Sequence, residues 1–287
     1  MPRLPADAFV GQLKEVCVAI GNRLDREWPA NRPSPEGEQV VLRSLVLASG
    51  NTFSAVLYSC AELPPDPLRK IEYSLAFPPL ARVILEAVFT VNFLFEDLPV
   101  RAKWFMLAGW RAMAEEHALS VSTFGADANW REWLDSHERA VSAMADGLGI
   151  AFVDRATPEV VAKYWPTPGK MMNDPSLGAD RLARMRYLDQ WFYGQFSSAA
   201  HLKWSGLARS TAPLLRHHLG ENLKAGLVKS RSDVIVSAAV MLLALLSEIE
   251  IEMRFGHSAQ LKYVWVTLGE VVDYVKFLYE SHYQPRL

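Results

Sequence analysis

The chain has 287 residues, of which 50% are hydrophobic and 22% are charged, so its composition is that of a folded globular protein and excludes an intrinsically disordered one. Thirty basic and 32 acidic residues leave a formal net charge of −2. This charge neither indicates nor excludes a nucleic-acid partner, and it gives no argument for an anionic membrane.

The compartment is predicted from the first residues and the cysteines. The segment from Met1 to Asp7 has no apolar run behind a basic start, so we expect no secretory signal. Cys17 and Cys60 lie in apolar, helix-like surroundings and match no metal-binding spacing. They are typical of small core residues, and we expect a cytoplasmic protein without a disulfide.

In the first half of the chain, apolar residues recur at steps of three and four, which predicts helices. The expected helices cover residues 8–27, 36–61, 80–95, 99–123 and 126–148. Proline clusters separate the first three, and Pro78-Pro79 is expected to open the helix over 80–95, because proline is tolerated in a first helical turn.

In the second half, prolines break residues 154–180 into short pieces, and regular helical spacing then returns. The expected helices cover 179–203, 213–220, 232–254 and 258–282. No segment alternates with period two for long enough to predict a strand. The sequence therefore predicts an all-α fold: a single multi-helix bundle over 1–287 without significant sheet. The N-terminal helix pair over 1–62 is a candidate for a semi-independent unit within it.

One segment, Val234 to Leu246, is apolar enough to be considered as a membrane span. It has about 13 residues, against the roughly 20 that a spanning helix needs. Charged residues lie before it, and Glu248, Glu250 and Glu252 follow it. We expect a buried core helix and no membrane association.

Several chemistries are not supported by any motif. A glycine-rich phosphate loop, a dinucleotide-binding fingerprint and a nucleophile elbow are all missing from the sequence. No histidine has a glutamate three residues before it, which disfavours a di-iron bundle. We therefore predict no metal site and no cofactor.

Two segments match the spacing of the all-helical HEPN ribonucleases, in which four to six residues separate an arginine from a histidine. They pair Arg111 with His117 and Arg131 with His137. The spacing sets a cation beside an acid/base on adjacent turns. Twenty arginines and seven histidines give roughly one or two such matches by chance, so charged residues on solvated helix faces are the favoured interpretation.

Arg82 and Glu86 lie four residues apart in the most apolar helix of the first half, hence on one face. Apolar residues surround them over nearly the whole circumference, which indicates a helix buried all round. A buried arginine and glutamate need hydrogen-bonding partners. We therefore expect both side chains to be paired and largely buried.

A second helix carries Tyr193, Ser197 and His201 at four-residue steps, which makes a polar stripe. A phenol, a hydroxyl and an imidazole both donate and accept hydrogen bonds. We predict that this stripe faces Arg82 and Glu86. Three interpretations remain open: a hydrogen-bond network that fixes helix register, a binding or catalytic pocket, and a coincidence of unrelated positions.

These residues also carry a resemblance. The run from Leu80 to Ala87, then Trp165 and Lys170-Met171-Met172, then Tyr193 to His201, resembles a bacterial helical domain-of-unknown-function family, number fifty-six seventy-seven, over roughly residues 38–250. The signature positions would be Arg82, Glu86, Tyr193, Ser197 and His201. The family usually follows its histidine with proline and small residues, whereas Leu202-Lys203-Trp204 stand here. The resemblance implies an α-helical fold and brings no established activity.

Two functions follow as expectations. The first is self-association or partner binding in a bacterial stress or defence setting, with a homo-oligomer formed through the aromatic-rich C-terminal helix. The second is a hydrolase or HEPN-like ribonuclease. There His201 would be the acid/base, Glu86 its partner and Arg82 the anion clamp, while Tyr193 and Ser197 would position substrate.

Overall fold

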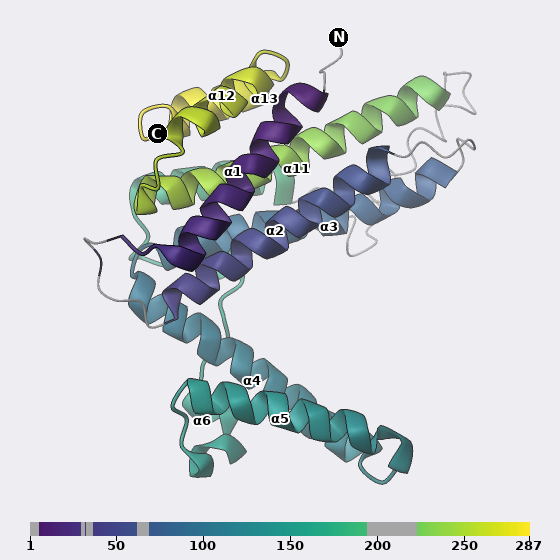
Figure 1. Cartoon of the computed structure of the whole chain (residues 1–287), viewed down its shortest axis with the longest axis vertical. Coiled ribbons are helices and arrows are strands. Elements are labelled where there is room, and N and C mark those ends of the chain that lie inside the picture. Colours follow the sequence, from purple (N-terminus) through teal and green to yellow (C-terminus); the bar gives the residue numbers. More distant parts are fainter. Residues whose placement is uncertain (1–5, 30–31, 33–36, 62–68, 194–222) are drawn as a thin grey trace.

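A computed structural model describes residues 6–29, 32, 37–61, 69–193 and 223–287, with side chains over 9–29, 32, 37–59, 79–193 and 233–287. Within these ranges the chain is helical and holds no strand, which confirms the predicted all-α class (Figure 1). The α-helices are α1 (Ala6–Arg26), α2 (Glu38–Ala61), α3 (Arg69–Leu94), α4 (Leu98–Phe124), α5 (Arg131–Gly147), α6 (Pro158–Val161), α7 (Pro168–Met171), α8 (Ala179–Leu188), α11 (Leu223–Met253), α12 (Ser258–Gly269) and α13 (Asp273–Leu278). Short 3-10 turns form η1 (Ala128–Trp130) and η2 (Phe152–Ala156), and π-helical turns form η3 (Asp189–Tyr193) and η4 (Tyr279–Tyr283).

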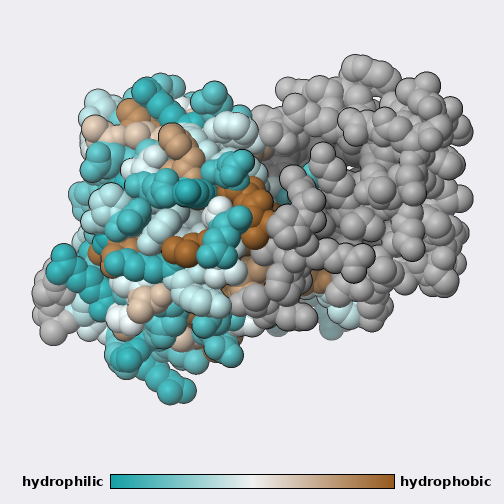
Figure 2. Space-filling model, turned by 90° about the horizontal axis from the view of Figure 1, so that it is seen from above, coloured by the Kyte–Doolittle hydropathy of each residue, from teal (hydrophilic) through white to brown (hydrophobic). Residues whose placement is uncertain are grey.

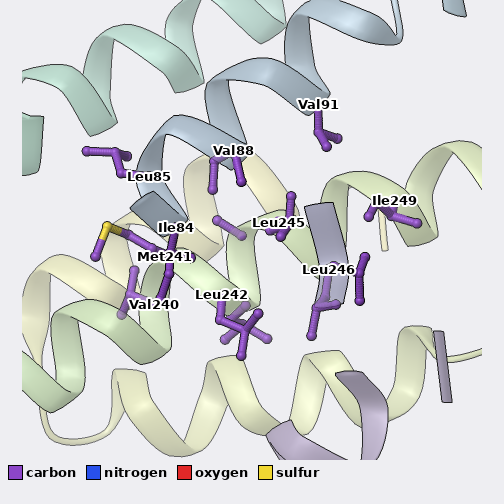
Figure 3. Packing of buried hydrophobic residues seen from close by; sticks show 14 of the residues in the cluster. Ile84, Leu85, Val88, Val91, Val240, Met241, Leu242, Leu245, Leu246 and Ile249 are labelled. Atoms are coloured by element: carbon purple, nitrogen blue, oxygen red, sulfur yellow. The ribbon is translucent and has the colours of Figure 1, made fainter. Parts of the chain in front are cut away.

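Helix α11 is the centre of the bundle, and α1, α2, α3 and α12 pack around it. Figure 3 shows side chains of α3, among them Ile84 and Val88, against Met241 and Leu245 of α11. All four are fully buried. Each such side chain contributes about 1.5–3 kcal/mol relative to an exposed one. Residues of α1 and α2 belong to this same core.

The segment expected to be a core helix, residues 234–246, lies in α11, where every residue from Ala238 to Glu250 is buried. The argument from its length is wrong, however, since α11 has 31 residues. Two segments, Glu38–Ser59 and Asp233–Met253, are long and apolar enough to cross a membrane by length and composition alone. In the second, 78% of the apolar window is buried inside the bundle, as in the core helix of a globular protein. On the face seen in Figure 2, described apolar residues form small groups among hydrophilic ones.

Three predicted helix boundaries are wrong. Helix α11 begins at Leu223, before the expected start at residue 232. Helix α3 begins at Arg69 and runs through Pro78-Pro79, so the proline pair does not open it. Packing against both α2 and α11 holds α3 helical although two backbone donors are missing. The expected helix over 258–282 breaks after Gly269, because the chain folds back so closely that a Cβ there would lie 3.2 Å from the Cα of Lys276.

Helices α4 and α5 run beside each other and extend away from the bundle, with α6 beside them (Figure 1). We call residues 107–164 the arm. A small core of its own, with Trp110, Ala145 and Ile150 buried, holds the arm together. The arm is thus anchored to the bundle by the first turns of α4 and leaves much of its surface free.

Candidate functional site

Arg82 of α3 joins two of the side chains predicted to accompany it. Its Nε donates to a Glu86 carboxylate oxygen at 2.7 Å, and its Nη2 donates to the Tyr193 hydroxyl at 3.2 Å. The guanidinium carbon lies 5.2 Å from the centre of the Tyr193 ring, within the range of a cation–π contact. The expected pairing of Arg82 with Glu86 and the facing of Tyr193 are confirmed.

The expected burial of this pair is wrong. The Arg82 side chain is 22% exposed and that of Glu86 is 42% exposed, while neighbouring Val83 is 45% exposed. Helix α3 therefore has a solvent-facing edge, since its packing against α2 and α11 covers only part of its circumference. A partly exposed ion pair of this kind contributes little to the stability of the fold, but a ligand can reach it.

Tyr193 is the last residue of the π-helical turn η3, which continues directly from α8. Its ring packs at 5.9 Å from Phe89 of α3, which fixes the phenol beside Arg82. Ser197 and His201 lie outside the described residues. The structure therefore describes three of the five residues of the predicted pocket, Arg82, Glu86 and Tyr193. The positions of the other two stay predictions.

The first HEPN-like match is engaged in a local network on the arm. The Arg111 guanidinium binds Glu115 at 2.7 Å and the Ala162 carbonyl at 2.9 Å, and it lies 3.7 Å from the centre of the Tyr164 ring. The Tyr164 hydroxyl and then Arg111 lower the pKa of Glu115 by donating hydrogen bonds to it. Arg111 thus joins the segment after α6 to α4, which is a structural role.

The two histidines of these matches meet between α4 and α5. The rings of His117 and His137 lie 5.4 Å apart in an edge-to-face arrangement, and Trp133 packs on His137. The Nδ1 atoms of both histidines are buried without a hydrogen-bond partner in the described part of the chain. The packing of α4 against α5 therefore brings the two imidazoles together.

A buried ionic network joins α8 and α11, and it was not predicted from the sequence. Arg184 of α8 and Glu248 of α11 form a two-bond ion pair at 2.6 and 3.1 Å, and neither side chain is more than 1% exposed. Arg181 binds Glu96 at 3.1 Å and also binds Glu252. Further ion pairs of Glu252 and Glu248 bring in Arg32 and Arg286.

A signal for this network was present in the sequence. The sequence predicts Glu248 and Glu250 as a charged flank of the apolar run, but both are buried. They follow that run without a break in helical spacing, and Arg181 and Arg184 lie three residues apart in α8, hence on one face. Buried carboxylates require such partners.

No three histidine, cysteine, aspartate or glutamate side chains are grouped to hold a metal ion among the residues that the structure describes. Comparisons of the chain with protein-family models, with curated proteins and with solved structures found no match.

Proposed function

We propose that the protein acts by self-association or partner binding, and that the arm is the binding surface. One observation carries this proposal: of the eighteen large hydrophobic residues exposed in the described part of the chain, eight lie on the arm. They are Leu119, Val121, Trp130, Trp133, Phe152, Val153, Val160 and Tyr164. Concentrated exposed apolar and aromatic side chains are typical of protein–protein interfaces.

Charge favours a particular mode of association. The arm carries nine acidic and five basic residues, a formal charge of −4, so the rest of the chain carries +2. Like charges disfavour contact between two arms, whereas the arm of one copy and the bundle of another attract. In a reciprocal dimer, each arm lies on the bundle of the other copy. This arrangement covers the exposed apolar residues of the arm and places its negative charge against the positive bundle.

We propose a cytoplasmic protein that acts in a bacterial stress or defence setting. The alternative surface for association is the C-terminal helix, for which the sequence predicts a homo-oligomer. Most of its apolar residues pack within the chain, and Tyr263, Val266 and Phe277 are the large ones about half exposed. This supports the arm over the C-terminal helix.

Cross-linking of mixed isotopes tests the arrangement directly. Lys163 is the only lysine of the arm. In an equal mixture of unlabelled and 15N-labelled protein, we expect mixed-isotope links between Lys163 and lysines of the bundle. Association of the arm with the bundle would be refuted if every cross-link joined two lysines of the same copy. It would also be refuted if the links between labelled and unlabelled copies never involved Lys163.

A second candidate function is a hydrolase that uses Arg82, Glu86, Tyr193, Ser197 and His201. The contact of Arg82 with Glu86 and Tyr193 favours it, because a cation, a carboxylate and a phenol meet at an accessible edge. His201 would supply the acid/base. Incubation with RNA and nucleotide panels should give turnover that is lost in His201→Ala and Tyr193→Phe. Arg23→Ala is the control, because Arg23 forms the same kind of pair with Glu27 at exposed positions at the end of α1.

A HEPN-like ribonuclease on the arm is less well supported. Arg111 is occupied by Glu115, the Ala162 carbonyl and Tyr164, and the acidic arm repels RNA phosphates. Only the contact of His117 with His137 favours it. RNA cleavage that is abolished by His117→Ala, but not by His201→Ala, would assign activity to the arm instead.

A further inference from the structure

The chain leaves α11 and enters α12 close to the C-terminus (Figure 1). A cavity of about 530 Å³ is lined by residues of this connection and by Arg286 and Leu287. Its lining includes Glu250, Arg254, Ser258 and Arg286. Small-molecule sites in proteins have volumes of roughly 300–1,000 Å³. The cavity therefore has the size of a site for an amino acid or a mononucleotide, and it lies on the bundle, apart from the arm.

The backbone at Arg254 is unusual. Arg254 follows the last residue of α11 and has φ +56°, in the left-handed region, and its N–H bonds the Glu250 carbonyl at 2.8 Å. Glycine usually occupies this position after a helix, because a Cβ is strained there. Its guanidinium forms no hydrogen bond or ion pair with any residue that the structure describes. Arg254 is exposed, so its guanidinium is available to a ligand at the cavity, and the strained backbone holds it at this position.

Glu250 offers an unused acceptor at the same cavity. The residue is only 2% exposed, and its Oε1 accepts hydrogen bonds from the backbone N–H groups of Gly256 and His257 and from the Ser258 hydroxyl, at 3.0, 3.0 and 3.1 Å. Its Oε2 is buried without a hydrogen-bond partner in the described part of the chain. Buried polar atoms are rarely left unpaired, so this oxygen points to a missing N–H donor.

Arg286 is the second arginine that lines the cavity. Its Nη1 lies 3.7 Å from a Glu248 oxygen, yet it makes no hydrogen bond within the described residues and is buried. Two guanidiniums, one of them without a counter-ion, favour an anionic group such as a carboxylate or phosphate. The carboxylate of Glu250 repels a ligand that is only an anion and attracts one that also carries an N–H donor.

We propose that this cavity binds a small molecule that combines a carboxylate or phosphate with an N–H donor, as an amino acid or a nucleotide does. Arg254 and Arg286 hold the anionic group, and Glu250 accepts the N–H bond. The site is separate from the association surface of the arm, so either assignment stands without the other.

Calorimetric titration and thermal unfolding of the full chain test the site with defined probes: inorganic phosphate, acetate, L-glutamine, L-arginine, AMP and GMP. We expect one amino acid or one nucleotide to raise the melting temperature and to bind about tenfold or more tightly than phosphate or acetate. The amino-acid and nucleotide arms of the panel distinguish the two sources of this chemistry.

Arg254→Gly separates binding from folding. Because glycine suits a positive φ, the unliganded variant should melt at the same temperature as the wild type or higher, while its affinity for the active probe falls about tenfold or more. Glu250→Gln should weaken probes with an N–H donor and spare phosphate. Arg139→Ala, an exposed arginine on α5, should bind normally. The proposal is overturned if no probe binds, if phosphate binds as tightly as every other probe, or if Arg254→Gly keeps full affinity.

Discussion

Arg82 and Tyr193 are 111 residues apart in sequence, yet the Arg82 guanidinium donates to the Tyr193 hydroxyl and lies over the Tyr193 ring. This contact ties the solvent edge of α3 to the end of η3. It is the described part of the polar constellation that the sequence predicted, and it defines the position from which the chain continues toward Ser197 and His201.

The first prediction concerns the strength of this contact. A double-mutant cycle of Arg82→Ala and Tyr193→Phe should give a coupling of about 0.5–1 kcal/mol in urea unfolding, as expected for a partly exposed hydrogen bond, because phenylalanine keeps the ring and loses only the hydroxyl. Arg23→Ala, which removes an exposed helical pair, should cost less than Arg82→Ala. A coupling of zero would mean that the contact is not maintained in solution.

The second prediction concerns the fully buried ion pair. Arg184→Ala leaves the Glu248 carboxylate buried without its two-bond partner, so it should cost about 3–5 kcal/mol of unfolding free energy. Arg186→Ala, on the exposed side of the same helix, should change stability by less than about 0.5 kcal/mol. Chemical denaturation measures both, and equal effects at the two sites would contradict the burial of Arg184.

The third prediction concerns the crossing of α1 and α2. A Cβ at Gly50 would lie 2.8 Å from the Sγ of Cys17, closer than side chains normally approach. Gly50→Ala should therefore destabilise the wild type, although alanine is the better helix former by about 1 kcal/mol. In a Cys17→Ala background the same change should stabilise the protein. The same sign in both backgrounds would exclude the close approach.

The fourth prediction concerns alkaline pH. Burial raises the pKa of the Cys17 thiol to about 11 from its ordinary value of 9.0. The folded state therefore holds this proton more tightly than the unfolded state, so the stability that it contributes is complete below pH 9 and falls as the pH rises toward 11. Between pH 8 and 10.5, Cys17→Ala should lose less stability than the wild type in thermal unfolding. Parallel losses would contradict the raised pKa.

The sequence was sufficient for the fold class, because helical periodicity persists over nearly every segment and strand periodicity does not. It was also sufficient for the pairing of Arg82 with Glu86 and the facing of Tyr193, although the burial from which that prediction was argued is wrong. It could not give the continuation of α3 through Pro78-Pro79, which depends on packing against helices far along the chain. Burial of Glu248 depends likewise on Arg184, a residue whose position only the tertiary structure sets.

The arm, likewise, could not be predicted from the sequence. The helices that form it were expected, but the pattern of apolar residues does not reveal that α5 packs mainly on α4 and leaves Trp133 and Phe152 exposed. An apolar face predicts that a helix packs against a partner. It does not specify whether that partner belongs to the same chain or to another.

Sedimentation velocity tests the central claim, association through the arm, most directly. Over about 1–100 µM, the wild type should shift from monomer to dimer, and the variant Trp133→Ser/Phe152→Ser should remain monomeric, because two exposed aromatic anchors of the arm are lost. Tyr263→Ser/Phe277→Ser removes matched aromatics from the C-terminal helices and should dimerise like the wild type. A wild type that stays monomeric throughout, or a dimer lost only in the C-terminal variant, would contradict the claim.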